Sequence, residues 1–234
     1  INSLTKEQLT DKLGSYSPKF KAILKEIDQG IGNVFVYSSY LRLGGINVFA
    51  KVLQANGYKN ILDKKMGGGK KEKKEKKKEK KEKEKYYGIW SGETSEVDRA
   101  KIIKIQNSAE NKYGDLIKIF LATGAGAEGI TLKNIRQVHI IEPYWDEARL
   151  EQVIGRAARI ISHTDLPVKE REVESFVYIS TAPTGVNLET LFGKGEIMTT
   201  DEHMLTRARQ KQMILDQFFT AIREMAIDCS LNYE

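Results

Sequence analysis

The most informative stretch of this sequence is Gln152-Val-Ile-Gly-Arg-Ala-Ala-Arg159. It lies on a pattern of apolar residues at helical spacing that begins after Asp146, and this pattern predicts a helix. The apolar positions are Leu150, Val153, Ile154 and Ala157. Because Gln152, Arg156 and Arg159 follow one another at intervals of four and three residues, we expect them to share one face of that helix.

Gly155 is an unfavourable choice inside a helix, by about 1 kcal/mol relative to alanine, so its presence suggests that something approaches the backbone closely there. The planar guanidinium groups of Arg156 and Arg159 match phosphate oxygens and stay charged, so a bare surface beside them would suit a polyphosphate. Taken alone, an Arg-x-x-Arg pair favours a surface helix with two solvated arginines. The surrounding sequence therefore decides between the two readings.

A glycine-rich segment precedes this helix. The apolar run 116–123 predicts a buried strand, and glycines follow at positions 124, 126 and 129. A strand followed by a loop of small residues is an arrangement that handles phosphate or ribose at the carboxyl edge of a parallel sheet. The alternative is a tight turn that needs glycine for steric reasons only. A further apolar strand, 136–142, leads on to Pro143-Tyr-Trp-Asp146.

Together, the segments 121–132, 138–146 and 152–159 resemble motifs V and VI of the superfamily 2 helicases and translocases. The continuation Ile161-Ser-His-Thr-Asp-Leu-Pro-Val-Lys-Glu-Arg171 is similar to the nucleoside triphosphatase I group of the large cytoplasmic DNA viruses, which is related to the chromatin-remodelling translocases. The resemblance covers roughly residues 33–181, and a weaker one covers 200–232. It implies an α/β fold, in which a parallel sheet flanked by helices forms a RecA-like second helicase lobe with a C-terminal helical extension.

The resemblance also implies roles at a nucleotide site. Arg159 would be the arginine finger, with Arg156 beside it, and Gln152 would sense the γ-phosphate or position water. The residues expected to face the nucleotide are Gly126, Glu128, Gly129 and Gly155. Among these, Glu128 would bond the ribose or couple the nucleotide site to the nucleic acid.

A second group of residues is expected to meet the backbone of a nucleic acid. By resemblance, Thr123 and Gly124 lie there. Ser38 and Ser39 follow the apolar strand 33–38 and match motif IV, where a hydroxyl contacts a phosphate; the alternative is that they cap a helix over 44–56. Arg99 stands on a predicted helix where related motors place an arginine (motif IVa), although Arg99 taken alone favours the alternative of a salt bridge on a surface helix.

The net charge of +6 does not by itself indicate a nucleic-acid surface. The run 70–85 contains 11 lysines and 5 glutamates, and the rest of the chain, with 27 basic and 27 acidic residues, is neutral. The run 70–85 is part of a longer low-complexity insertion, 64–85. This insertion cannot be buried and is expected to be a solvated loop, or a tether for anionic partners. Any nucleic-acid surface must come from local placement of charge.

The chain divides into three predicted parts. Residues 1–32 form a helical lead-in of two short helices, the second of which begins at Ser17-Pro18. Residues 33–182 form the RecA-like lobe with its insertion. Residues 183–234 contain a loop and, from Thr200, a long amphipathic helix that packs back on the lobe or on a partner lobe.

Several features of a complete motor are missing from the 234 residues. There is no P-loop lysine and no Asp-Glu box for magnesium, so we expect ATP and Mg²⁺ to be held largely by a first lobe of a longer parent, cut before Ile1. This chain alone should be inactive. The three histidines do not pair with the single cysteine, Cys229, at metal-ligand spacing, so no metal site is expected.

The remaining expectations concern surroundings and partners. The lone cysteine fits a reducing compartment, and no apolar run approaches the ~20 residues needed to cross a bilayer, so an intracellular protein without a membrane contact is expected, in the virion or host cytoplasm if it is viral. The expected partners are DNA or RNA, the N-terminal lobe of the parent and RNA polymerase. The resemblance implies the second motor lobe of an ATP-dependent translocase that is driven by DNA and acts in viral transcription. Two alternatives to this function stay open: an RNA helicase lobe, or a non-enzymatic module that docks nucleic acid or polymerase.

Overall fold

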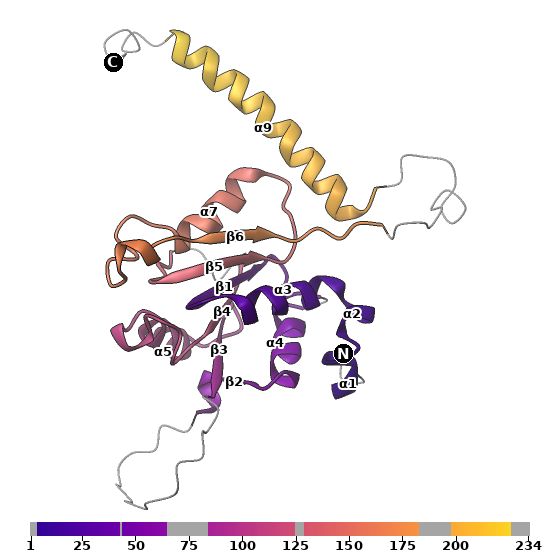
Figure 1. Ribbon diagram of the computed structural model, residues 1–234. Coiled ribbons are helices and arrows are strands. Elements are labelled where there is room, and N and C mark those ends of the chain that lie inside the picture. The colour runs from indigo at the N-terminus through magenta and orange to yellow at the C-terminus, as the bar shows by residue number, and fades with distance from the viewer. Residues whose placement is uncertain (1–3, 43, 65–83, 125–128, 183–197, 226–234) are drawn as a thin grey trace, which may run out of the picture.

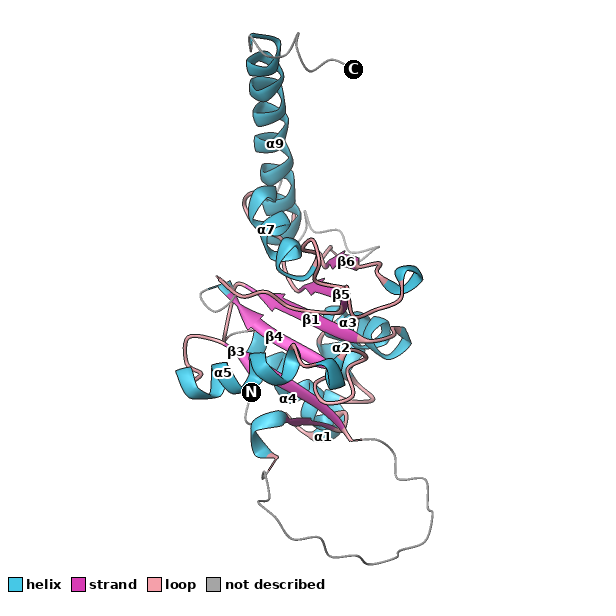
Figure 2. Ribbon diagram, turned by 90° about the vertical axis from the view of Figure 1, so that its left-hand side faces the viewer, coloured by secondary structure: helices cyan, strands magenta, loops and turns pink. Residues whose placement is uncertain are grey.

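The computed structural model describes residues 4–42, 44–64, 84–124, 129–182 and 198–225. Its centre is a parallel sheet of six strands in the order β2-β3-β4-β1-β5-β6 (Figures 1 and 2). The strands are β1 (Asn33–Ser38), β2 (Tyr58–Asn60), β3 (Lys85–Trp90), β4 (Ile119–Thr123), β5 (Ile135–Ile140) and β6 (Glu174–Val177). The predicted α/β fold with a parallel sheet is confirmed.

Helices cover both faces of the sheet, because the central strands are apolar on both sides. One face packs against α3 (Pro18–Gln29) and α4 (Ile46–Ala55), and the other packs against α5 (Glu96–Gln106) and α7 (Glu147–Ala157). The alternation of side chains along β1 shows the division: Val34 and Val36 join the first core, whereas Phe35 and Tyr37 join the second. Three 3-10 turns complete the lobe, η1 (Ile61–Asp63), η2 (Ala109–Asn111) and η3 (Val168–Glu170).

The lead-in contains three helices rather than the two predicted, because α1 (Lys6–Leu9) and α2 (Leu13–Tyr16) form separate turns before α3. The start of α3 is as predicted: Ser17 Oγ accepts a hydrogen bond from Phe20 N at 3.2 Å, and Pro18 occupies the first turn. The apolar face of α3 is buried in the same core as β1, so this helix packs as part of the lobe.

One strand was missed by the sequence analysis, and one predicted segment lies mostly outside the described residues. Strand β2 was not predicted, because three residues carry too little periodicity to be recognised. Residues 65–83 of the lysine-rich insertion lie outside the described residues, and β3 begins directly after them at Lys85.

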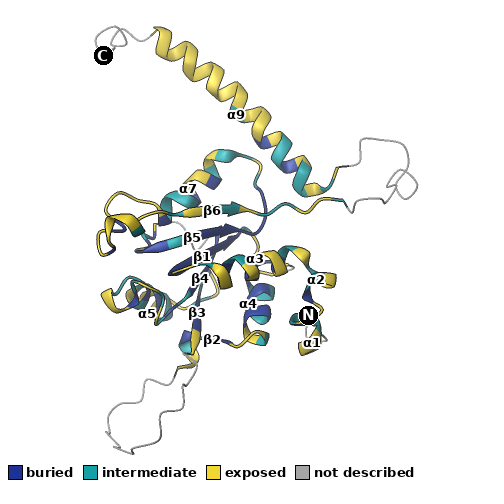
Figure 3. Cartoon of the chain, viewed as in Figure 1, coloured by how far each residue is buried: buried dark blue, intermediate teal, exposed yellow. Residues whose placement is uncertain are grey.

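Helix α9 (Thr200–Met225) begins on the lobe and then leaves it (Figures 1 and 3). Its first turn is tied down by Asp201, which pairs with Lys19 Nζ at 2.6 Å and accepts a hydrogen bond from Ser180 N at 2.8 Å. Met204 and Ala208 are buried, whereas the side chains from Lys211 onward are exposed except for the half-buried Gln212. Among the described helices, none is long and apolar enough to cross a membrane.

Candidate functional site

The carboxyl ends of three neighbouring strands bring the predicted nucleic-acid residues together. Strand β1 ends at Ser38 and β4 ends at Thr123, and these two residues are paired in the sheet register. Gly124 follows Thr123 directly, and β5 lies on the other side of β1. In a parallel sheet of this kind ligands bind at this edge, so the position suits the predicted role.

Glu142 organises this edge, and the sequence had not marked it as a site residue. Ser38 Oγ lies 3.0 Å from both carboxylate oxygens of Glu142 and donates to them, and Ser39 N also donates to Glu142 Oε1. Burial raises the pKa of Glu142, and the hydrogen bonds from Ser39 and Ser38 oppose that shift. A signal was present, since a carboxylate directly after a buried apolar strand needs partners.

Ser38 is fully buried and its hydroxyl faces Glu142, whereas Ser39 is half-buried and Tyr40 is exposed. Tyr40 N donates to Ser38 Oγ at 3.0 Å, so Ser38 shapes the turn that leaves β1. The alternative role as a helix cap is wrong: α4 begins only at Ile46, and Gly45 occupies its N-cap without a side-chain bond. Of the two serines, Ser39 lies nearer the surface.

Helix α7 begins as predicted, because Asp146 Oδ1 accepts a hydrogen bond from Arg149 N at 3.1 Å. It ends earlier than predicted, at Ala157, with Ala158 as the C-cap. Arg159 therefore lies just beyond the helix, and the expectation that it shares a helix face with Gln152 and Arg156 is wrong. The chain turns at once into residues 160–164, where Ile161 has a φ of 64°, and a continuous helix cannot follow that path.

Arg159, through its side chain, and Arg156, through its backbone carbonyl, both contact the segment that follows the glycine-rich stretch. Arg159 Nη1 donates to Thr131 Oγ1 at 2.5 Å, and the carbonyl of Arg156 accepts from Leu132 N at 3.1 Å. Arg159 and Gln152 are exposed, and Arg156 is half-buried. The end of α7 thus carries guanidinium groups at an accessible surface.

The glycines of the site differ in their surroundings. A Cβ on Gly155 would meet nothing within 4 Å, so no part of the described chain approaches its backbone, and the space beside Arg156 is open. Gly129 is exposed with a φ of 80°, which favours glycine. Gly126 and Glu128 lie outside the described residues.

Gly124 is buried beneath two side chains. A Cβ built on it would lie 2.9 Å from Arg149 Nη2 and 3.2 Å from Tyr37 Oη, so a larger residue would push against both. The Arg149 guanidinium carbon in turn lies 5.0 Å from the centre of the Tyr144 ring. Glycine at 124 therefore lets the ends of the Arg149 and Tyr37 side chains approach the backbone closely.

Arg99 lies on α5, whose N-cap Ser95 accepts a hydrogen bond through its Oγ from Asp98 N at 3.1 Å. The Arg99 guanidinium stacks over Trp90 with 5.9 Å between the guanidinium carbon and the ring centroid. Half-buried in this way, Arg99 is held near the carboxyl end of β3, at the same edge of the sheet as Ser39.

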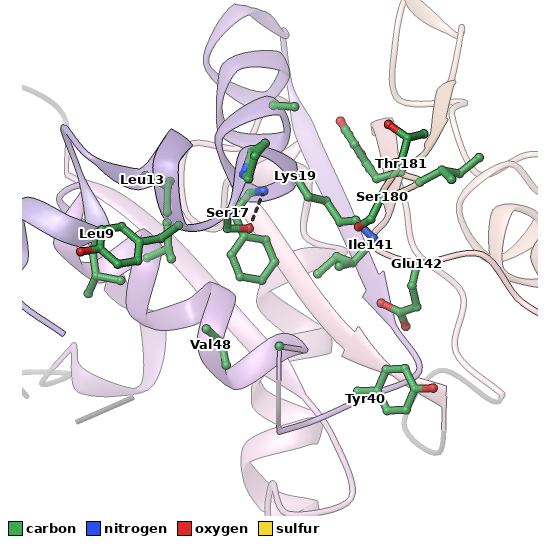
Figure 4. Close-up of a pocket in the computed structure, with 18 of the residues that line it drawn as sticks. Leu9, Leu13, Ser17, Lys19, Tyr40, Val48, Ile141, Glu142, Ser180 and Thr181 are labelled. Carbon is green, nitrogen blue, oxygen red and sulfur yellow. Dashed lines mark hydrogen bonds between the residues drawn. The ribbon is translucent and has the colours of Figure 1, made fainter. Parts of the chain in front are cut away.

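A cavity of about 1070 Å³ adjoins the Glu142 side of this edge (Figure 4). Its walls come from the lead-in helices, from α4 and from the chain after β6, and they are mainly apolar. Glu142, Tyr40 and Lys19 line it together with Ser180, so the cavity lies beside the turn that Glu142 holds.

The described residues contain no group of three or more histidine, cysteine, aspartate or glutamate side chains placed to hold a metal ion. His139 is a core residue: it is fully buried and stacks on Phe176 with 4.9 Å between ring centroids. Burial lowers the pKa of His139 to about 4.

With this geometry in view, comparison with known proteins gives a consistent result. Residues 19–161 match the helicase conserved C-terminal domain. A protein of Acanthamoeba polyphaga mimivirus, provisionally named ATP-dependent RNA helicase R563, is 36% identical over 231 residues, which cover 98% of this chain and 36% of the viral protein. The termination factor NPH-I homolog of African swine fever virus is 34% identical over 253 residues, covering 100% of this chain and 35% of that protein.

The chain therefore spans about a third of the length of these two relatives. Among solved structures, the C-terminal part of the Fun30 ATPase domain aligns with a TM-score of 0.47 at 16% identity, covering 85% of this chain and 54% of the other.

Proposed function

Because the chain belongs to the family of helicase conserved C-terminal domains, we propose that it is the second motor lobe of an ATP-dependent translocase that is driven by DNA and acts in viral transcription. The observation that carries this proposal is the pair Arg156 and Arg159 at the end of α7, beside the open backbone of Gly155. The name of the African swine fever virus relative, a termination factor homolog, supports a role in transcription with RNA polymerase as a partner.

In this proposal, Arg159 is the arginine finger. It rests on Thr131 through one hydrogen bond and is exposed, so it is free to turn toward a nucleotide brought by another lobe. Its guanidinium would then stabilise the negative charge that builds up on the transferred phosphoryl group, with Arg156 beside it. Gln152 is exposed on α7, about one turn before Arg156. It would contact the γ-phosphate or hold the attacking water.

The sheet edge with Ser39, Thr123 and Gly124 would follow the backbone of the nucleic acid. Contacts to phosphates give binding that tolerates any sequence and weakens as salt rises. Glu142 has a positioning role here, because it fixes the turn that presents Ser39. Arg99, stacked on Trp90 at the same edge, would add a positive charge to the track.

The remaining parts of the reaction belong to the N-terminal lobe of the parent. Mg²⁺ bound with ATP would neutralise charge on the phosphates, and its ligands are expected on that lobe. The guanidinium donors of this chain fit the phosphate side of such a complex, since they are planar, permanently charged and accessible. An intracellular location, in the virion or the host cytoplasm, follows from the proposed role.

A second candidate is an RNA helicase lobe, which the name of the mimivirus relative favours. The two candidates share the arginine chemistry and the phosphate track, and they differ only in which nucleic acid stimulates ATP hydrolysis. A non-enzymatic docking module is the third possibility, and the presence of both Arg156 and Arg159 speaks against it.

The deciding experiment measures ATP hydrolysis by the full-length parent with single-stranded DNA, duplex DNA or RNA, beside its Arg159→Ala variant. We expect DNA to stimulate hydrolysis, and we expect the variant to lose roughly 10³-fold in stimulated turnover, because it lacks the finger. Arg159→Lys should recover little, since lysine lacks the planar fork.

Arg136→Ala is the matched control. Arg136 lies at the opposite end of β5, where its Nε donates to the carbonyl of Glu172 at 3.0 Å, and its removal should leave turnover unchanged. Stimulation by RNA alone would identify an RNA helicase. If no nucleic acid stimulates hydrolysis, or if the Arg159→Ala variant keeps full turnover, the proposed motor function is wrong.

A further inference from the structure

Arg149 connects the end of β4 to helix α7. Its Nη2 atom lies 2.9 Å from the point where a Cβ of Gly124 would stand, so the guanidinium rests against the Gly124 backbone. Tyr37 Oη, from the end of β1, lies 3.2 Å from the same point. Gly124 is therefore enclosed by one side chain from the helix and one from the neighbouring strand.

The guanidinium of Arg149 is itself held in place. It stacks over the Tyr144 ring at 5.0 Å, an attraction between the cation and the face of the ring. The backbone of Arg149 is fixed as well, because its N–H donates to the capping residue Asp146 at 3.1 Å. Arg149 is half-buried, so it is not an ordinary solvated surface charge.

The same helix holds the proposed finger at its other end. Arg149 stands in the first turn of α7, and Arg156 stands in the last turn, where its carbonyl accepts from Leu132 N. Arg159 follows two residues after the helix. The buried residues Leu150, Val153 and Ala157 pack the helix on the sheet between these two ends, so one packed element joins Arg149 to Arg156.

We propose that Arg149 is the positioning residue that couples the nucleic-acid edge to the arginine finger. Thr123 and Gly124 are buried, and Ser39 is the accessible residue beside them. A nucleic-acid backbone bound at Ser39 would act through the buried Thr123 and Gly124 on the Arg149 guanidinium that covers Gly124, and through it on α7, which sets the place of Arg156 and Arg159. This inference rests on the proposed function, and it adds a coupling residue that neither contacts the nucleotide nor reads the nucleic acid.

Two simpler roles make different predictions. If Arg149 bound a phosphate of the nucleic acid directly, its removal would weaken binding and lower the salt dependence by about one charge. If Arg149 only stabilised the fold, its removal would lower all activities in proportion to the folded fraction. Only a coupling role predicts that the Arg149 variant keeps its affinity for nucleic acid and its basal ATP turnover and loses only the stimulation of ATP turnover by nucleic acid.

The test uses the full-length parent and its variants Arg149→Ala and Arg149→Lys, with Arg136→Ala as the matched arginine control on β5. Basal ATP turnover, turnover at saturating nucleic acid, the KM for ATP and the affinity for nucleic acid at several salt concentrations are measured for each. Circular dichroism and thermal unfolding report the folded fraction.

For Arg149→Ala we expect stimulated turnover to fall about tenfold, within the range of 5–150-fold that coupling between two sites commonly spans, while basal turnover, the KM and the salt dependence stay unchanged. Arg149→Lys should lose less, because a lysine keeps a cation over Tyr144 but not the planar fork. Arg136→Ala should behave as the wild type.

Three results would overturn the inference. Equal loss of basal and stimulated turnover assigns Arg149 to the fold or the nucleotide site, and a weaker affinity with reduced salt dependence makes it a direct phosphate contact. Full stimulation in Arg149→Ala shows that α7 is coupled by other residues. If the wild-type parent shows no stimulation, the proposed function fails and the coupling role with it, so the two failures can be told apart.

Discussion

The Glu142 carboxylate shows how a single side chain shapes the candidate site. It accepts hydrogen bonds from the backbone of Ser39 and the hydroxyl of Ser38, and it is almost completely buried. Burial of a carboxylate is unfavourable unless its oxygens are satisfied, and these contacts supply that satisfaction. The turn after β1 is therefore held at a definite geometry by a residue that follows another strand.

Replacing Glu142 with glutamine tests this role through the pH dependence of stability. Burial raises the pKa of Glu142 above its ordinary value of 4.5, so the folded state keeps a proton that the unfolded state loses first. The wild type should therefore lose stability relative to Glu142→Gln as the pH rises above about 4.5, at up to about 1.4 kcal/mol per pH unit, until the folded pKa is passed. Below that window the two proteins should differ little.

The measurement is urea unfolding of the chain between pH 4 and pH 8. The side-chain oxygen of glutamine can accept from Ser39 N, and its amide N–H can donate to Ser38 Oγ. The turn should therefore persist in the variant. Glu110→Gln, at an exposed carboxyl before β4, serves as the control and should follow the wild type. Parallel curves for Glu142→Gln and the wild type would show that burial does not perturb this carboxyl.

At the scale of the helix, α9 presents one apolar face to two environments. Met204 and Ala208 are buried where α9 starts on the lobe. Leu215, Phe218 and Ile222 continue the same face at helical spacing, yet they are 43%, 58% and 47% exposed. The first half of the predicted packing on the lobe is thus present, and packing of the second half on a partner lobe stays a prediction.

Two methionines on α9, one in the part that packs on the lobe and one in the exposed part, allow the stability contributions of the two parts to be compared. Met204→Ala should lower the free energy of unfolding by about 2 kcal/mol or more, because it removes a buried side chain and leaves a cavity. Met213→Ala should change it by less than about 0.5 kcal/mol, since Met213 is mostly exposed. Urea unfolding of the two variants makes the comparison, and equal effects would mean that the start of α9 does not pack on the lobe.

At the scale of the whole molecule, the sheet order places the two proposed functions on one lobe. β1 lies between β4 and β5, so the residues after β1 and β4 form the proposed nucleic-acid edge, and α7 follows β5. In the proposed motor, the arginines at the end of α7 would supply one side of a nucleotide site. In the proposed motor, the other side comes from the first lobe.

The chain by itself is therefore predicted not to hydrolyse ATP. Two arginines without a phosphate-binding loop or a magnesium site can bind a polyphosphate weakly, but they leave the reaction without most of its transition-state stabilisation. Release of inorganic phosphate by the purified chain should equal that of a buffer blank, with and without DNA. Turnover that also persists in Arg159→Ala would contradict the half-site proposal.

Local sequence signals located most of the elements, although they missed the short strand β2 and the end of α7. The helix after Asp146 and the helix that begins at Ser17-Pro18 both start where they were expected, because capping depends only on neighbouring backbone groups. The apolar runs 33–38, 116–123 and 136–142 gave β1, β4 and β5, and the family resemblance gave the parallel sheet. The same resemblance is the basis for the proposed roles of the arginines and of the nucleic-acid edge.

What the sequence by itself determined, then, is where most of the helices and strands lie and which segments are candidates for phosphate chemistry, since these depend on periodicity and on side chains close in the chain. Only the tertiary structure decided that Ser38 faces Glu142, 104 residues away, that Arg149 covers Gly124, and that Arg159 leaves the helix to reach Thr131. These contacts depend on strand order and on exact side-chain distances. Packing of distant segments sets such distances, and no local pattern encodes them.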